Sequence, residues 1–242
     1  MMSRKTIGIL GGMGPEATAY FFELLIKNTK AACDQEHIPI LIWNNPQIPP
    51  RTDAILHKGR SPWPLLRQGL DVLEKAGAGL IVMPCITAHY YIPQIKRRVQ
   101  VPFVNLLEQS TDYAKKAIPG LKKAGLIASS GTVASGLWHR TFESAGIEII
   151  TPNRTDQEQV MEAIFGRRGV KAGFTSGLPK QAILRVARKL IRRGAQAIIA
   201  GCTEVPLVLG PKDIPVPLIE PMKIAALACI RKAGYKIKES KS

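Results

Sequence analysis

The chain has 242 residues, of which 45% are hydrophobic and 21% are charged. This composition is sufficient for one large folded domain or two small ones, and it excludes an intrinsically disordered chain. There is no run of about 18 apolar residues, so we expect no membrane-spanning helix. The first residues carry only a short apolar run before a glycine-rich loop, which is not the pattern of a secretory signal and predicts a cytoplasmic protein.

The net charge is +16, from 34 Lys and Arg against 18 Asp and Glu, and it favours anionic partners. The basic residues form short clusters beside apolar-periodic segments, as on solvated helix faces, and aromatic residues that would stack on bases make up only 6% of the chain. We therefore interpret these clusters as solvated helix faces and expect no nucleic-acid partner. The four cysteines form no C-x-x-C pair and the four histidines lack zinc-ligand spacing, so neither a disulfide framework nor a metal site is expected.

Apolar runs alternate with amphipathic segments along the chain, a pattern typical of an α/β fold with parallel sheets. Strands are predicted at Thr6–Leu10, Pro39–Trp43, Leu80–Met83, Phe103–Leu106, Ala124–Ala128, Ile147–Ile150, Ala197–Ala200 and near Val216–Ile219. Helices are predicted at Pro15–Ala32, Leu65–Lys75 and Tyr90–Val99, and another follows the strand that ends at Leu106 and continues to about Ala117. Further helices are predicted at Val133–Ser144, Gln157–Phe165 and Gln181–Arg193, and from Pro221 onward. A proline-rich loop is expected over 44–62 and a glycine-rich stretch over Gly166–Gly177.

The chain resembles itself at a constant offset. Ile7–Gly14 aligns with Ala124–Gly131, and Gly77–Cys85 aligns with Gly194–Cys202, so that the two cysteines coincide. Buried parallel strands resemble one another, which accounts for the apolar runs but not for the matched cysteines. We therefore predict two similar Rossmann-like domains related by pseudo-twofold symmetry. The first would contain residues 1–113, with 216–242 returning to it, and the second residues 114–215.

Cys85 and Cys202 each end a strand and begin a loop, one in each predicted domain. Ligands of open α/β sheets bind at the carboxyl ends of the strands, so the two thiols would face each other across an interdomain cleft. One cysteine can then remove a proton from a carbon while the other delivers a proton to its opposite face, which inverts that carbon. For either cysteine alone a structural role is the better interpretation, but the matched pair favours catalysis. Polar residues follow both cysteines, namely Thr87, His89, Thr203 and Glu204.

Three motifs resemble the aspartate/glutamate racemase family: GGMGPEAT at Gly11–Thr18, MPCITAH at Met83–His89 and GCTE at Gly201–Glu204. The resemblance runs from Ile7 to about Pro221 and implies a cofactor-independent racemase with Cys85 and Cys202 as acid and base. It implies Arg51 and Lys171 as partners of the side-chain carboxylate of an acidic amino acid, and a homodimer. The implied substrate-binding residues are Met13, Arg51, Ile86, Thr87, Ala88, Thr132, Lys171 and Thr203.

Ile86 departs from the family pattern, which usually has Asn after the first cysteine, because isoleucine offers only its backbone amide. The resemblance implies aspartate, or glutamate, as the substrate, and Ile86 leaves another amino acid open. Isomerisation of maleate, racemisation of a hydantoin, and amino-acid binding without catalysis are alternatives. Without the resemblance, a solvated loop arginine explains Arg51 as well as a carboxylate-binding role does, and a basic surface residue explains Lys171 better. His89 either tunes the thiol or caps a helix.

A nucleotide-binding protein is a further alternative. Gly12–Ala17 fits G-x-G-x-x-A after a predicted strand. The second strand, however, ends at Trp43-Asn44-Asn45, without the acidic residue that binds a ribose in dinucleotide folds. Pyridoxal phosphate is not expected either, because neither cysteine motif contains a lysine that could form a Schiff base.

Overall fold

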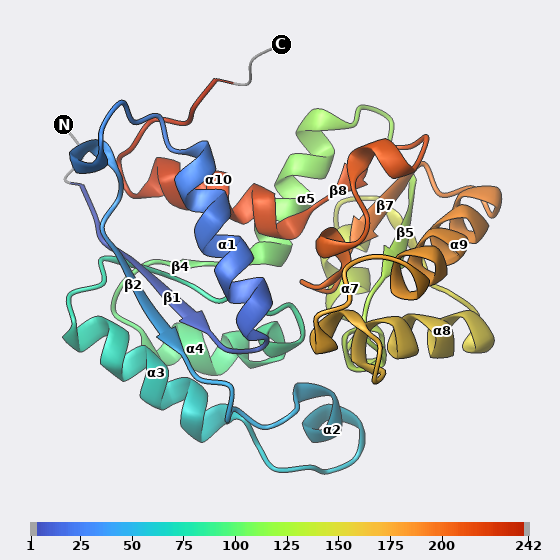
Figure 1. Cartoon of the computed structure of the whole chain (residues 1–242), viewed down its shortest axis with the longest axis horizontal. Helices are drawn as coiled ribbons and strands as arrows, with labels where there is room; N and C mark the ends of the chain where they lie inside the picture. The colour runs from blue at the N-terminus through green and yellow to red at the C-terminus, as the bar shows by residue number, and fades with distance from the viewer. Residues whose placement is uncertain (1–3, 240–242) are drawn as a thin grey trace.

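The computed structural model describes residues 4–239, which form two four-stranded parallel sheets, one in each half of the chain (Figure 1). The first sheet has the order β2-β1-β3-β4 and the second the order β6-β5-β7-β8, which confirms the predicted fold class. The first sheet contains β1 (Ile7–Gly11), β2 (Ile40–Asn44), β3 (Leu80–Val82) and β4 (Phe103–Val104). The second contains β5 (Lys123–Ile127), β6 (Glu148–Ile150), β7 (Ala197–Ala200) and β8 (Leu218–Ile219).

The two sheets also share the register of their central strands. Ile7 of β1 pairs with Leu80 of β3. The residues aligned with them by the internal repeat, Ala124 of β5 and Ala197 of β7, pair in the same way. The repeat seen in the sequence therefore corresponds to two sheets of equal topology.

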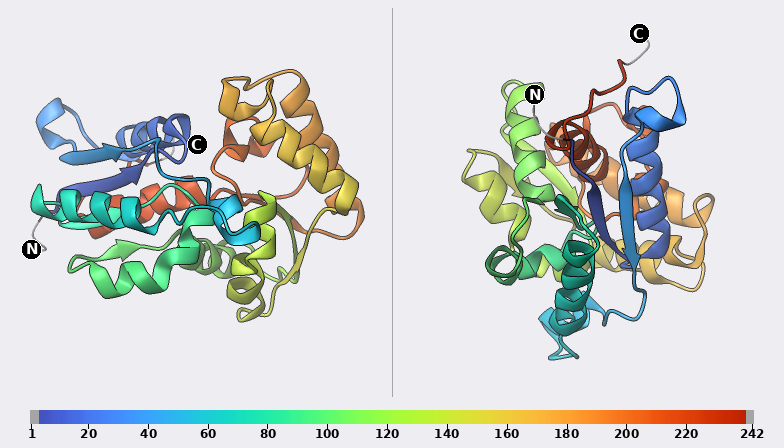
Figure 2. Two further views of the ribbon diagram at one scale, coloured as in Figure 1. Left: turned by 90° about the horizontal axis from the view of Figure 1, so that it is seen from below. Right: turned by 90° about the vertical axis from the view of Figure 1, so that its left-hand side faces the viewer.

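Helices pack against both sheets (Figures 1 and 2). The first half contains α1 (Pro15–Asn28), α2 (Arg51–Leu56), α3 (Trp63–Lys75), α4 (Ile92–Arg98) and α5 (Leu106–Ala117). The remainder contains α6 (Ser130–Ala134), α7 (Leu137–Glu143), α8 (Arg154–Phe165), α9 (Leu178–Arg192) and α10 (Pro221–Lys232). None of the helices within residues 4–239 is long and apolar enough to cross a membrane.

Two predicted segments contain elements other than those expected. The single helix expected over Val133–Ser144 is divided into α6 and α7, because Gly136 adopts a left-handed conformation with φ of 64° that a helix interior does not accept. The loop expected over 44–62 contains the short helix α2, which begins directly after Pro50. This helix places Arg51 at its first turn.

The C-terminal segment joins both halves of the molecule. β8 pairs with β7 in the second sheet, so residues 216–219 do not return to the first half as predicted, because β7 satisfies the backbone groups of β8. The return begins with α10, which packs against α1 and α5. Ile237 then pairs with Thr29, and this extended conformation ends α1 at Asn28 instead of near Ala32.

One apolar core runs through both halves. It includes Ile9 of β1 and Val82 of β3 from the first sheet, and Leu126 of β5 and Ile199 of β7 from the second. Trp138 of α7, which is fully buried, belongs to the same cluster. Since burial of apolar surface holds the halves together, the carboxyl ends of the two sheets keep a fixed relation to each other.

Candidate active site

A cavity of about 1000 Å³ lies between the two halves, at the carboxyl ends of their strands. The first half contributes the loops after β1, β2 and β3, and the second half contributes the loop after β7 and part of the segment around α8. The predicted site residues in its wall are Met13, Arg51, Cys85, Ile86, Thr87, Lys171, Cys202 and Thr203. The structure thus brings together both cysteines and both cations.

Two predicted residues lie outside the cavity wall. Ala88 is fully buried in the core of the first half. Thr132 is 1% exposed and lies behind Thr87, with 2.7 Å between their hydroxyl oxygens. Ser129 completes this hydroxyl cluster, at 3.2 Å from Thr87 Oγ1 and 3.1 Å from Thr132 Oγ1. The three hydroxyls connect the loop after β3 to the loop after β5, so Thr132 supports the cavity wall from behind.

Cys202 follows β7 and has a carboxylate as its partner. Gly201 packs so closely that a Cβ atom there would lie 2.3 Å from Leu126 Cδ1, which fixes the path of the loop. The Cys202 Sγ lies 2.9 Å from Glu204 Oε2, and the residue is only 7% exposed. Burial raises the pKa of the Cys202 thiol well above its ordinary value, and Glu204 raises it further, against the opposing effect of Lys171. The thiol therefore donates a hydrogen bond to the carboxylate.

Glu204 joins Cys202 to Lys171, although it is absent from the site implied by the family resemblance. It is 3% exposed, and its Oε1 forms an ion pair with Lys171 Nζ. Its Oε2 also lies 3.2 Å from Thr203 Oγ1. Burial alone would lower the pKa of the Lys171 ammonium, but Glu204, together with Cys202 and Cys85, raises it above its ordinary value. The sequence signal for Glu204 was its position in GCTE, two residues after the cysteine.

Cys85 follows β3 and is 4% exposed. Within residues 4–239 its thiol has no acidic side chain in hydrogen-bond contact. His89 Nδ1 lies 2.8 Å from the carbonyl oxygen of Cys85, and His89 Nε2 accepts a hydrogen bond of 3.1 Å from the Leu106 N–H. Burial lowers the pKa of His89 to about 4, so its neutral ring donates from Nδ1. His89 thus fixes the loop and caps α5. Of the two roles considered for His89, tuning the thiol or capping a helix, its contacts match helix capping.

Arg51 is held by backbone carbonyls, and one nitrogen of its guanidinium is left without a hydrogen-bond partner in the described part of the chain. Nη1 donates to the carbonyls of Ile48 and Pro49, and Nη2 to that of Met13, each at 3.1 Å. Nε is buried and has no partner among residues 4–239. Nε and the second hydrogen of Nη2 form one fork of the guanidinium, the geometry that binds a carboxylate through two parallel hydrogen bonds.

Residues 10–229 match the family described as Asp/Glu/hydantoin racemase. The chain belongs to this racemase family. An aspartate racemase from Picrophilus torridus has 32% sequence identity and a TM-score of 0.85, with 97% of this chain and 96% of that chain covered. The broad specificity amino-acid racemase RacX of Bacillus subtilis is 27% identical over 234 residues, which is 94% of this chain and 95% of that protein. Glutamate racemase from Francisella tularensis, solved with D-glutamate, shares the fold at 17% identity and a TM-score of 0.69, over 95% of this chain and 81% of that chain.

The glycine-rich loop of this racemase-family chain has a structural explanation. Gly12 has φ of 94°, and a Cβ atom there would lie 2.3 Å from the backbone carbon of Asn45. The Gly12 N–H donates to Thr18 Oγ1 at 2.9 Å, which ties the loop to α1. Close packing of the loop against the chain after β2 therefore accounts for the glycine without a bound nucleotide.

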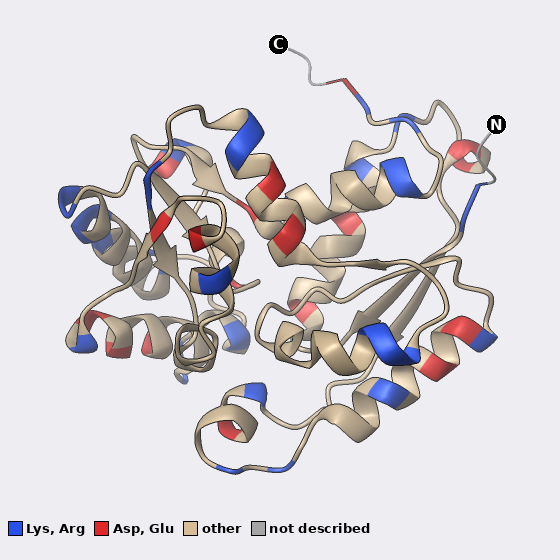
Figure 3. Cartoon of the chain, turned by 180° about the vertical axis from the view of Figure 1, so that it is seen from behind, with Lys and Arg blue, Asp and Glu red and all other residues tan. Residues whose placement is uncertain are grey.

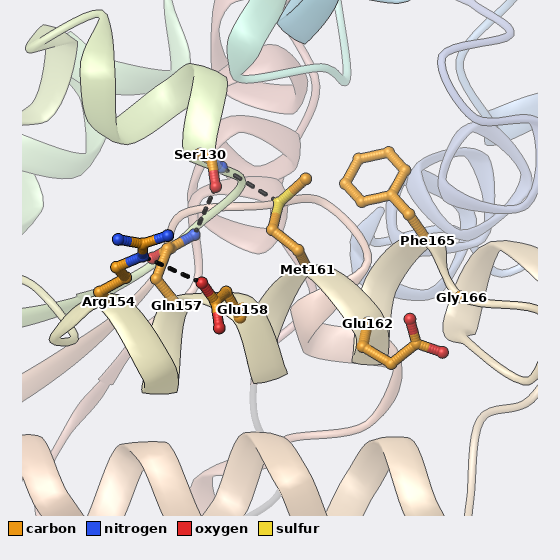
Figure 4. Close-up of a pocket in the computed structure, with 8 residues that line it drawn as sticks. All are labelled: Ser130, Arg154, Gln157, Glu158, Met161, Glu162, Phe165 and Gly166. Carbon is orange, nitrogen blue, oxygen red and sulfur yellow. Dashed lines mark hydrogen bonds and ion pairs between the residues drawn. The ribbon is translucent and has the colours of Figure 1, made fainter.

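A second, shallower hollow of about 500 Å³ adjoins the racemase-family cavity (Figure 4). Met161 and Phe165 of α8 line both hollows. Its polar side chains are largely paired with one another: Gln157 Nε2 lies 3.2 Å from Ser130 Oγ, and Arg154 pairs with Glu158. Phe165 also lies under Lys171, whose Nζ is 5.5 Å from the ring centre. The hollow therefore extends the mouth of the main cavity on the α8 side.

Proposed function

We propose that the protein is a cofactor-independent racemase of an acidic amino acid, aspartate or glutamate, in which Cys85 and Cys202 act on opposite faces of Cα. The observation that carries this proposal is the pair of buried cysteines, which line one cavity from the two halves of the chain. Arg51, which lines the same cavity and whose Nε has no partner within residues 4–239, supports an acidic substrate. Similarity to an aspartate racemase and to a broad specificity racemase supports the reaction class.

The proposed reaction transfers one proton at each face of Cα. Arg51 holds the side-chain carboxylate through Nε and Nη2. A thiolate removes the Cα proton and becomes a thiol, while the electron pair stays on Cα. The second thiol then donates its proton to the opposite face and becomes a thiolate, and the product has inverted configuration. Loop amides and the Lys171 ammonium stabilise the negative charge that develops on the substrate. Met13, Ile86, Thr87 and Thr203 border the substrate, with Ala88 and Thr132 behind them.

Proton exchange at Cα tests this function directly. L-aspartate, with glutamate and alanine in parallel, is incubated with the protein in deuterium oxide, and loss of the Cα proton and the enantiomer ratio are measured. We expect exchange and racemisation by the unaltered protein. Cys85→Ala and Cys202→Ala should each abolish racemisation, and each should retain exchange with no more than one enantiomer, because one face has lost its base.

The same samples separate the alternatives. If both single variants racemise at the unaltered rate, the two-cysteine mechanism is wrong. Amino-acid binding without exchange would indicate a non-catalytic binding protein, and conversion of maleate without exchange of aspartate would indicate the related isomerase. Activity lost with hydroxylamine and restored by pyridoxal phosphate would overturn cofactor independence. The proposed homodimer is tested by light scattering on the same preparation.

A further inference from the structure

The internal repeat makes the two cysteines equivalent in position but not in surroundings. The alignment that superimposes Cys202 on Cys85 also superimposes Glu204 on Thr87. A carboxylate therefore stands beside one thiol where a hydroxyl stands in the other half. The Thr87 hydroxyl is engaged with Thr132 and Ser129.

The charged neighbours of Cys202 favour its protonated form. Glu204 Oε2 lies 2.9 Å from the Cys202 Sγ. A Cys202 thiolate would therefore face a carboxylate at hydrogen-bond distance, and both groups are buried. Lys171 opposes this repulsion, but its Nζ is bonded to Glu204 and not to the sulfur. A neutral thiol donating to an ion-paired carboxylate satisfies all three groups.

The other charged side chains of the cavity leave this asymmetry in place. The charged residues in its wall are Glu16, Arg51, Asp53, Lys171 and Glu204. Arg51 donates to three backbone carbonyls. Glu16 and Asp53 are exposed, so water screens their charges. On the Cys85 side, His89 is neutral, and its two ring nitrogens bond to the Cys85 carbonyl and to the Leu106 N–H.

We propose that Glu204, held in place by Lys171, keeps Cys202 as the protonated thiol of the ligand-free enzyme, so that Cys85 is the base and Cys202 the acid of the first proton transfer. This inference deepens the proposed racemase function and rests on it. Glu204 is a positioning residue, because it contacts the Cys202 sulfur and acts through it.

The proton balance closes over one turnover. The Cys85 thiolate takes the Cα proton, and the Cys202 thiol delivers its proton to the other face. This leaves a Cys202 thiolate beside the Glu204 carboxylate. The repulsion between them favours recapture of a proton from water by Cys202, while Cys85 releases its newly acquired proton to water. The enzyme thereby returns to the form that started the reaction.

Alkylation of the ligand-free protein with iodoacetamide tests the inference, because only a thiolate reacts rapidly. The rate at each cysteine is followed by peptide mass spectrometry over a range of pH. At about pH 7.5, Cys85 should react at least about tenfold faster than Cys202. Access alone predicts the opposite order, because Cys202 is 7% exposed and Cys85 is 4% exposed.

Substitution of the carboxylate should reverse this protection. In Glu204→Gln the side chain keeps its shape, loses its charge and leaves the Lys171 ammonium near the sulfur. The pH midpoint for alkylation of Cys202 should then fall by about one unit or more. Lys171→Met should shift that midpoint upward. Glu204→Asp, which retains the charge, should stay closer to the unaltered protein than Glu204→Gln, and a merely structural role for Glu204 would not give this order.

The matched control is Glu162→Gln, which removes an exposed carboxylate of α8 and should leave the Cys202 midpoint unchanged. Equal midpoints for Cys85 and Cys202, or a Cys202 midpoint that stays constant or rises in Glu204→Gln, would overturn the inference. Racemisation of aspartate is measured on the same preparations. Racemisation that requires both cysteines, combined with an unprotected Cys202, would refute the inference alone. Protection of Cys202 without any racemisation would refute the proposed function alone.

Discussion

At the scale of single residues, His89 and Glu204 occupy similar positions after the two cysteines but have different bonding partners. Both are buried ionisable residues close behind a cysteine. Backbone groups occupy both ring nitrogens of His89, whereas a thiol and an ammonium occupy the oxygens of Glu204. His89 therefore holds the backbone, whereas Glu204 contacts one of the two thiols in the proposed mechanism.

Burial of neutral His89 makes stability depend on pH. The pKa of His89 is lowered from 6.5 to about 4, so the unfolded chain binds a proton more readily than the folded one between these values. The stabilisation is present above pH 6.5 and is lost as the pH falls toward 4, by about 3 kcal/mol in total. Urea unfolding should show this loss in the unaltered protein and a shallower one in His89→Gln. Identical pH slopes in the two proteins would contradict it.

Arg51 holds backbone carbonyls and is proposed to bind the substrate carboxylate, and the choice of substrate can separate these two roles. Arg51→Lys keeps a positive charge but loses the planar fork. With one charge-assisted hydrogen bond contributing about 1.5–3 kcal/mol, kcat/KM on aspartate should fall by about ten- to a hundredfold. Activity on alanine, which has no side-chain carboxylate, should fall much less. Equal losses on both substrates would mean that Arg51 only holds the Met13 and Ile48 carbonyls.

At the scale of elements, α2 lies against α6 of the other half, and this contact places Arg51 over the cavity. Gly131 of α6 permits the contact, because a Cβ atom there would lie 2.8 Å from Thr52 Cα. Gly131→Ala must therefore displace α2, since backbone cannot rotate away as a side chain can. We expect a higher KM for aspartate with a smaller effect on kcat.

Steady-state kinetics and thermal unfolding of Gly131→Ala check this expectation. Gly79→Ala is the matched control, because the nearest atom to its Cβ would be the Cβ of Lys5, at 3.2 Å, outside the cavity. The control should leave KM unchanged. A loss of stability in Gly131→Ala with an unaltered KM would show that the α2–α6 contact does not position the substrate site.

At the scale of the whole molecule, the excess of positive charge is distributed over helices of both halves (Figure 3). Many of these charges flank the sheets, and the cavity itself holds two cations, Arg51 and Lys171, one from each half. Lys171 is paired with Glu204, so we expect Arg51, whose Nε has no partner among the described residues, to be the cation that binds the proposed substrate carboxylate. For the acidic substrate that we propose, a diffuse field and one directed contact would act together.

Much of the fold was predictable because its signals are local. Apolar runs specified the strands, and the offset between Cys85 and Cys202 indicated two equivalent strand ends. Gly136, by contrast, broke a predicted helix through a backbone conformation that helical periodicity does not reveal. The sequence did not predict that β8 belongs to the second sheet, because a strand of two residues carries too little pattern to specify its partner.

The sequence by itself determined the α/β class, the internal repeat and the two cysteines at matching strand ends, because each depends on neighbouring residues or on similarity between segments. Only the tertiary structure decided the partners of the functional side chains. Lys171 pairs with Glu204, Arg51 donates to Met13, and Thr87 contacts Thr132, all between residues far apart in the chain. Such contacts depend on how two sheets pack around a shared core, and that packing brings Lys171 to the carboxylate that follows Cys202 in the chain.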